Sequence, residues 1–249
     1  MTDKIRICAI IPVREGLISW GDAHRTLLSS IASPDVEITL VDLPSAPIKA
    51  INGSYDTQLV GLLQVQEVIK AEQAGYDAVA TGCLDEPGVS AAKDAVNIPV
   101  VGEAEAAMHF ASMVGRRFSF LLPGEASGNM RGGHGGLPIE DLARKYGFIS
   151  KLASIRSVSS GGSLDFADPE EGLPQATLEQ ASLAVEEDGA DAVIGYGSLD
   201  IIGYLTEHLD VPVIDPIQSA AIMAETLARL DLAQSKRAVP KRMHLATAS

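Results

Sequence analysis

The sequence is poor in several residue types, and each shortage excludes a class of protein. Only two cysteines, Cys8 and Cys83, occur in 249 residues. Two cysteines cannot build the disulfide framework of a secreted scaffold, and neither lies in a Cys/His spacing typical of a metal site. We therefore expect a protein of the reducing cytoplasm without a bound metal. The early apolar run at 5–11 is too short to span a bilayer, so we expect no membrane segment.

Positive charge is also scarce. The chain has 19 Lys and Arg against 33 Asp and Glu, which gives a formal net charge of -14 at pH 7. The average surface field therefore repels a polyanionic backbone. We therefore do not expect nucleic acid as a partner.

The hydrophobic content of 46% includes few aromatic residues, only 4% of the chain. Small aliphatic residues in this proportion are typical of buried parallel strands that alternate with tightly packed helices. Helical patterns separate most of the strand-length apolar runs, which indicates an α/β fold with parallel sheets. The eight runs lie at 5–11, 36–41, 77–81, 98–101, 118–122, 152–158, 191–195 and 211–214.

An internal repeat is the most informative feature of the chain. The segment 71–79 recurs as 185–193, and 97–101 recurs as 210–214. Two matches in the same order and at nearly the same separation indicate a duplicated unit. We therefore predict an α/β fold of two pseudo-symmetric lobes, each a parallel sheet flanked by helices. The predicted first lobe is 1–101 plus 216–235, the second lobe is 102–215, and 236–249 is a C-terminal tail.

Each copy of the repeat leads from a strand into a loop of mostly small residues. The first loop reads Thr-Gly-Cys-Leu-Asp at 81–85, and the second reads Gly-Tyr-Gly-Ser-Leu at 195–199. Ligands of open parallel sheets bind beyond the carboxyl ends of the strands, where amides and helix N-termini can hold an anion. The two loops are therefore predicted to face one cleft. The expected substrate-binding residues in them are Leu84, Asp85, Gly197 and Ser198.

The first loop carries a family resemblance. Residues 83–89, Cys-Leu-Asp-Glu-Pro-Gly-Val, resemble the first cysteine motif of the aspartate/glutamate racemase superfamily, and most closely that of its hydantoin and allantoin racemase branch. Segments 52–56, 102–109 and 188–191 agree as well, so the resemblance covers nearly the whole chain. It implies a homo-oligomeric, cofactor-independent enzyme of the isomerase type. The implied substrate is a small carboxylate or a cyclic amide similar to hydantoin.

One half of the family's chemistry is missing from this sequence. Racemases of the family place two cysteines on opposite faces of a carbon acid, whereas here Gly197 stands where the second cysteine is expected. Cys83 is thus the expected catalytic thiol, and Tyr196 is the first candidate to replace the second one, ahead of Asp200, His109 and His134. A single-thiol decarboxylase, lyase or hydrolase remains open, and arylmalonate decarboxylase is a similar case. A non-catalytic metabolite-binding protein remains open too.

Two further segments depart from the branch. After the first strand the chain reads Ile-Pro-Val-Arg at 11–14, so Pro12 and Arg14 are expected beside the substrate. Arg14 could clamp a carboxylate there, or it could be a solvated loop charge. The glycine-rich stretch 123–136 is expected to form a mobile lid that brings Gly124 to the substrate, or to be a surface loop without such a contact.

The reactivity of Cys83 depends on its surroundings. A thiol pKa of about 8.5 falls near helix N-termini, which predicts a lowered pKa here. Asp85 and Glu86 would oppose that shift unless their side chains point away. Backbone amides near Leu84 and Ser198 are expected to hold the enolate or carboxylate that forms. Cys8 lies within an apolar strand and is expected to be buried and inert.

Overall fold

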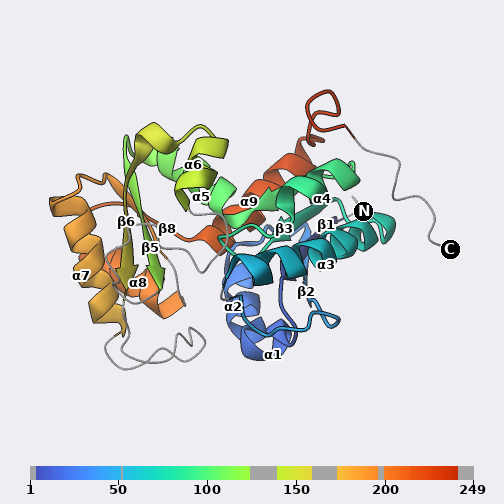
Figure 1. The fold of residues 1–249 in the computed structure, drawn as a ribbon, viewed down its shortest axis with the longest axis horizontal. Coiled ribbons are helices and arrows are strands. Elements are labelled where there is room, and N and C mark those ends of the chain that lie inside the picture. Colours follow the sequence, from blue (N-terminus) through green and yellow to red (C-terminus); the bar gives the residue numbers. More distant parts are fainter. Residues whose placement is uncertain (1–3, 52, 124–138, 159–172, 196–198, 241–249) are drawn as a thin grey trace.

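The structure is a computed structural model that describes residues 4–51, 53–123, 139–158, 173–195 and 199–240. These residues form two parallel four-stranded sheets with the same strand order, β2-β1-β3-β4 and β6-β5-β7-β8 (Figure 1). The predicted α/β fold of two pseudo-symmetric lobes is therefore confirmed. The first sheet contains β1 (Ile5–Ile11), β2 (Val36–Asp42), β3 (Ala78–Thr81) and β4 (Val100–Gly102). The second contains β5 (Phe118–Pro123), β6 (Leu152–Val158), β7 (Ala192–Ile194) and β8 (Val213–Ile214).

Helices cover both faces of the first sheet, which explains why its strands are almost wholly apolar. Because strand side chains alternate between faces, Cys8 and Ile10 pack with one set of helices and Ile7 and Ala9 with another. The first set is α3 (Ser54–Gln73) and α4 (Val89–Ala95), and the second is α2 (Gly21–Ile31) with α9 (Pro216–Arg229). The short helix α1 (Gly16–Ser19) precedes α2.

The second sheet is covered in the same way. Phe118 and Phe120 of β5 pack with α5 (Glu103–Val114) and α6 (Ile139–Lys145). Leu121 of β5 points to the other face and packs with α7 (Leu173–Glu186) and α8 (Leu199–His208). A short 3-10 helix, Ile149–Lys151, leads into β6.

Two helices cross between the sheets. Helix α5 follows β4 of the first sheet but packs on the second, whereas α9 follows β8 of the second sheet and packs on the first. The two helices also contact each other (Figure 1). Their first residues therefore lie near the junction of the lobes, directly after the carboxyl ends of β4 and β8.

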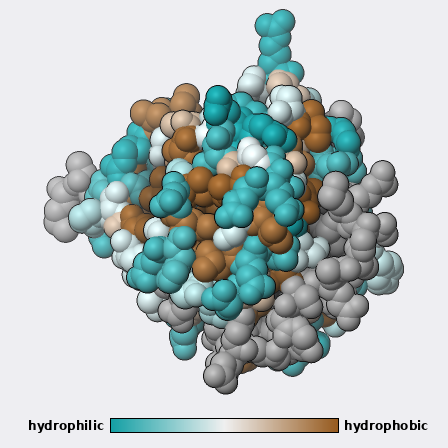
Figure 2. Space-filling view, turned by 90° about the vertical axis from the view of Figure 1, so that its left-hand side faces the viewer, coloured by the Kyte–Doolittle hydropathy of each residue, from teal (hydrophilic) through white to brown (hydrophobic). Residues whose placement is uncertain are grey.

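The outer strands of the two sheets carry polar contacts that limit further strand pairing. Gln234 accepts a hydrogen bond from the backbone N–H of Val100 and donates one to its carbonyl, both at 3.2 Å, at the β4 edge. On the β6 edge Arg156 forms an ion pair with Asp188. Figure 2 looks onto the side where α7 lies, and there hydrophobic residues in the middle of the face are bordered by hydrophilic ones. No helix among the described residues is long and apolar enough to cross a membrane.

Candidate active site

Cys83 lies just beyond the carboxyl end of β3, in a loop of unusual backbone conformation. Its φ of 75° is in the left-handed region, which residues other than glycine rarely adopt. The carbonyl of Cys83 accepts a hydrogen bond from the N–H of Glu86 at 3.0 Å, and helix α4 begins only at Val89. A strained residue at a strand end is typical of a functional position, because the surrounding structure must hold it there.

Gly82 brings this loop close to the end of β1. Its N–H donates to the carbonyl of Ile10 at 2.7 Å. A Cβ at Gly82 would lie 2.7 Å from that oxygen and 3.1 Å from Cδ of Pro12, so the position has room only for glycine. The structure thus brings the predicted site residues Pro12 and Cys83 together at the carboxyl ends of β1 and β3.

The two residues after Cys83 are both buried. Leu84 is 5% exposed and packs with Ala107 and Met108 of α5, so its side chain is part of the core. Asp85 is also 5% exposed, and its backbone N–H donates a hydrogen bond to the Cys83 sulfur. A substrate contact by Leu84 would therefore have to come from its backbone.

The electrostatic surroundings of Cys83 oppose ionisation. Although the residue is half-buried rather than fully buried, loss of hydration is the largest cause that raises the pKa of its thiol well above the usual value. The negative charges of Asp85, Glu103 and Glu86 raise this pKa further, and the Asp85 N–H lowers it only in part. The predicted lowering of the pKa is wrong, because these carboxyl groups act on the sulfur while α4 starts six residues later. At neutral pH Cys83 of the free protein is therefore a thiol.

Two buried acids that the sequence reasoning missed lie at the starts of the crossing helices. Glu103 is the first residue of α5, and its carboxyl accepts a hydrogen bond from the backbone N–H of Cys83. Burial, Asp215 and Glu86 together raise the pKa of Glu103 to about 8. Asp215 caps α9 by accepting from the N–H of Gln218 at 2.9 Å, and burial raises its pKa too. Their positions directly after strands were the signal that could have identified them.

A small pocket of about 20 Å³ lies between the end of the first sheet and helices α2 and α9. Glu103 and His24 contribute to its lining, which otherwise consists mostly of small and aliphatic residues, with Thr81 and Gly82 from the start of the cysteine loop. Nδ1 of His24 lies within hydrogen-bond distance of the Trp20 carbonyl, at 3.0 Å. Burial lowers the pKa of the His24 ring. This volume corresponds to one water molecule and is too small for a ring-shaped substrate.

Comparison with known proteins identifies the family. A family model described as Asp/Glu/hydantoin racemase matches residues 22–224. The chain belongs to this family. As a member of it, the protein is an enzyme of the isomerase type.

Individual relatives of this racemase-family chain agree with that assignment. The hydantoin racemase of Paenarthrobacter aurescens is 34% identical over 199 residues, which covers 78% of this chain and 79% of the relative. The hydantoin racemase of Pseudomonas sp. (strain NS671) is 33% identical over 210 residues, covering 83% and 80%. In structure, the chain is similar to allantoin racemase from Klebsiella pneumoniae, with a TM-score of 0.82, 29% identity, and coverage of 98% of this chain and 97% of that one.

Arg14 of this racemase-family enzyme follows the carboxyl end of β1, and Cys83 follows the carboxyl end of β3 in the same sheet. Its backbone N–H donates to the carbonyl of Ile48 at 2.9 Å. Its Nε lies 3.7 Å from the carboxylate of Glu15, which also pairs with Lys49. The buried Nε has no hydrogen-bond partner among the described residues. Glu15 therefore offsets part of the charge that Arg14 could offer to a substrate carboxylate.

Several predicted site residues fall outside the described part of the racemase-family chain, namely Gly124, His134, Tyr196, Gly197 and Ser198. The side chain of Asp200 is not described either. His109 lies exposed on α5, where its Nδ1 is 2.8 Å from the carbonyl of Glu105 and its ring packs edge-on against Phe148. No group of His, Cys, Asp and Glu within the described ranges is arranged to hold a metal ion.

Proposed function

We propose that this racemase-family enzyme acts on a cyclic amide of the hydantoin type, and that Cys83 removes and returns the proton at the ring carbon beside a carbonyl. The observation that carries the proposal is the group of carboxyl side chains acting on Cys83, which are Asp85, Glu103 and Glu86. Glu103 is largely protonated at neutral pH, so the negative charges that repel a carboxylate substrate are those of Asp85 and Glu86. Carboxyl oxygens can accept hydrogen bonds from the N–H groups of a neutral ring. The hydantoin racemases among the relatives support this choice of substrate.

The proposed reaction needs only the thiol and the substrate. The Cys83 thiolate takes the proton from the ring carbon, and the electron pair of the broken C–H bond moves onto the carbonyl oxygen to form an enolate. The resulting thiol then returns a proton to the same carbon, and the neutral ring is restored. Backbone amides near Leu84 and Ser198 are the proposed donors to the enolate oxygen. The raised pKa makes the thiolate a stronger base for a weakly acidic C–H, although it reduces the thiolate fraction at neutral pH.

Cys83 is proposed to exchange the proton on one face of the ring, whereas isomerisation, which needs a proton delivered to the opposite face, is slower. Gly197 stands in the sequence where the family's second thiol is expected, so no second cysteine is available to protonate the opposite face. A hydrogen isotope from solvent should then enter with retention of configuration. The single-thiol decarboxylase, lyase and hydrolase remain alternatives, and the same experiment can detect the hydrolase by ring opening. Membership of an enzyme family disfavours the non-catalytic binding protein.

The test uses each enantiomer of a 5-monosubstituted hydantoin in deuterated buffer near neutral pH. Deuterium at the ring carbon is measured by NMR, and optical purity by chiral chromatography, with Cys83→Ser and a protein-free solution as controls. The expected result is enzyme-dependent deuterium entry that runs ahead of the loss of optical purity. Deuterium entry with inversion would instead identify a second acid such as Tyr196. Opening of the ring by water would instead favour the hydrolase alternative.

A further inference from the structure

We propose that Glu86 is a positioning residue whose carboxylate ties the cysteine loop of the first lobe to Tyr146 of the second lobe and so sets the position of Cys83. This inference rests on the proposed role of Cys83. Glu86 comes from the loop that follows β3, whereas Tyr146 directly follows α6, whose core residues pack on the second sheet. The contact therefore joins parts of the chain that are 60 residues apart.

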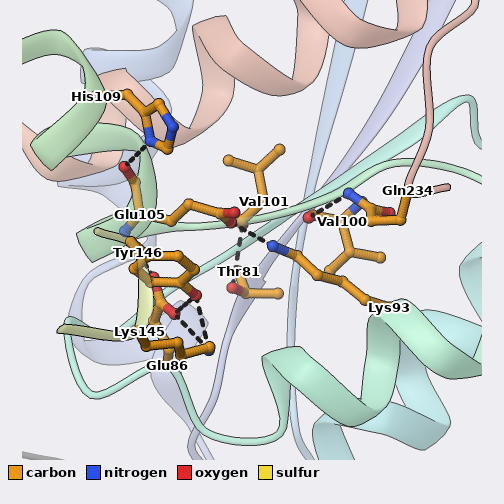
Figure 3. Close-up of polar contacts among 10 residues, drawn as sticks. All are labelled: Thr81, Glu86, Lys93, Val100, Val101, Glu105, His109, Lys145, Tyr146 and Gln234. Atoms are coloured by element: carbon orange, nitrogen blue, oxygen red, sulfur yellow. Dashed lines mark hydrogen bonds and ion pairs between the residues drawn. The ribbon is translucent and has the colours of Figure 1, made fainter. Parts of the chain in front are cut away.

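Three groups surround the Glu86 carboxylate (Figure 3). The Tyr146 hydroxyl donates a hydrogen bond to Oε2, and the backbone N–H of Glu105 donates to Oε1 at 2.7 Å. Nζ of Lys145 lies 3.8 Å from Oε2 and donates to the Tyr146 hydroxyl at 2.9 Å. The Glu86 side chain is only 1% exposed, so water cannot replace these partners readily.

The backbone transmits the position of Glu86 to Cys83. Glu86 has a left-handed φ of 50°, and its N–H donates to the Cys83 carbonyl at 3.0 Å. On the other side, the carboxylate packs so tightly against Gly102 that a Cβ there would collide with it. A shift of the Glu86 side chain must therefore move the turn that holds the thiol.

The charge of the Glu86 carboxyl is costly to bury, and it also affects Cys83. Burial raises the pKa of Glu86, since an ionised carboxyl is costly to bury, while Tyr146, Glu105 N–H and Lys145 lower it in part. Among the described residues, Glu105, which pairs with Lys93 at 2.5 Å, and Glu103 are further charged or titratable groups that interact with Glu86. The Glu86 charge also raises the pKa of Cys83. Glu86 thus acts on both the position and the basicity of the thiol.

The experiment is a double-mutant cycle of Glu86→Gln, Tyr146→Phe and the double variant in the full chain. One readout is the rate of Cys83 alkylation by iodoacetamide as a function of pH, measured by mass spectrometry. The other is kcat and KM for deuterium exchange into a hydantoin. Tyr204→Phe is the matched control, because that hydroxyl donates to Gln175 on the surface of the second lobe. Alkylation of the buried Cys8 reports any loosening of the fold.

We expect each single variant to lower kcat by about 10- to 100-fold with little change in KM, because a small displacement of a catalytic group has an effect of that order. The double variant should be no slower than the slower single variant. In Glu86→Gln the alkylation profile of Cys83 should also move to lower pH, since a negative charge near the sulfur is removed. A residue that only stabilised the fold would leave kcat unchanged in the folded variants.

Three outcomes would overturn the proposal. In the first, the fold-losses in kcat of the two single variants multiply in the double variant. In the second, Tyr146→Phe exchanges deuterium at the wild-type rate. In the third, the pH dependence of Cys83 alkylation is unchanged in Glu86→Gln. If Cys8 becomes reactive in Glu86→Gln, that variant has lost part of its fold, and Tyr146→Phe, which removes only a hydroxyl, is used instead. Its kcat and the pH dependence of its Cys83 alkylation are then measured, and wild-type values for both would refute the proposal. Absence of exchange even in the wild-type protein would contradict the proposed function, while the alkylation cycle would still decide the role of Glu86.

Discussion

Glu103, the first residue of α5, lies near Asp215, the N-cap of α9, and the negative charge of Asp215 helps to hold the pKa of Glu103 at about 8. Both residues are 5% exposed. Each follows the carboxyl end of a strand, β4 for Glu103 and β8 for Asp215. The fold thus buries two acids at its junction, and Glu103 is largely protonated at neutral pH.

This raised pKa predicts how stability depends on pH. Between the usual pKa of Glu103, near 4.5, and the folded value of about 8, the unfolded chain has lost its proton while the folded protein keeps it. The free energy of unfolding should therefore fall as pH rises through this window, by up to roughly 1.4 kcal/mol per pH unit, and the loss should be complete above it. Glu103→Gln should remove this contribution, so the free energy of unfolding of the variant should increase relative to that of the wild type as pH rises.

Urea unfolding at pH 5, 6.5, 8 and 9 measures the effect. Glu179→Gln, which changes an exposed glutamate on α7, should keep the pH dependence of the wild type. Parallel curves for Glu103→Gln and the wild type would mean that Glu103 ionises as readily in the folded protein as in the unfolded one.

Much of this fold could be predicted from local sequence signals. Each of the eight apolar runs overlaps one strand of the structure, with ends that differ by a few residues. The repeat of 71–79 as 185–193 placed β3 and β7 at equivalent positions, and both occupy the third place in their sheets. Periodicity and repetition work here because each strand and helix buries its own apolar face.

The polar part of the site could not be predicted in the same way. Glu86 is buried because Tyr146 and the N–H of Glu105, both distant in sequence, surround it. The pKa of Cys83 depends on where the side chains of Asp85 and Glu103 point, which the motif around the cysteine does not encode. Such properties arise from contacts between lobes, and the spacing of residues along the chain carries little information about them.

The raised pKa of Cys83 predicts slow alkylation at neutral pH. Iodoacetamide reacts with the thiolate, so the native protein should react more slowly at pH 7 than free cysteine, and its rate should rise about tenfold per pH unit well into the alkaline range. Mass spectrometry of timed samples identifies the modified residue, and urea-unfolded protein is the control. Saturating hydantoin should slow the reaction at Cys83. Rapid labelling of native Cys83 at pH 6 would contradict the direction of the shift.

The close approach at Gly82 makes a prediction about stability. Gly82→Ala places a Cβ 2.7 Å from the Ile10 carbonyl, which β1 holds in its sheet, so the backbone must shift. We expect a loss of about 1–3 kcal/mol in the free energy of unfolding, as for other overpacked sites. Gly203→Ala is the matched control, because Gly203 is exposed within α8 and no described residue has an atom within 4 Å of an added Cβ. Alanine there should stabilise the protein by about 0.5–1 kcal/mol. Equal effects of the two changes in urea unfolding would refute this explanation.

The two cysteines should differ sharply in their importance for catalysis. Cys83→Ser should lower deuterium exchange into a hydantoin by at least about a thousandfold, because a hydroxyl of similar size is a far poorer base at neutral pH. Cys8 is buried within β1, where burial raises its pKa to about 12, so Cys8→Ser should leave the exchange rate within a few-fold of the wild type. The exchange rate of each variant is measured by NMR beside its thermal unfolding curve. A Cys83→Ser protein that keeps most of its kcat would exclude the thiol mechanism.

Restoring a second thiol tests the proposed one-face chemistry most directly. Gly197→Cys places a cysteine at the point that the repeat makes equivalent to Cys83, so that one thiol can remove the proton while the other delivers one to the opposite face. We expect the variant to racemise either enantiomer of a 5-monosubstituted hydantoin, with one deuterium entering per inversion, at a rate above the racemisation rate of the wild type. Cys83→Ser combined with Gly197→Cys is the control. This double variant should not invert the substrate, because it keeps only one of the two proposed catalytic thiols. Inversion by the unmodified protein as fast as its deuterium exchange would contradict the one-face mechanism, and Tyr196→Phe would then test whether that tyrosine supplies the second proton.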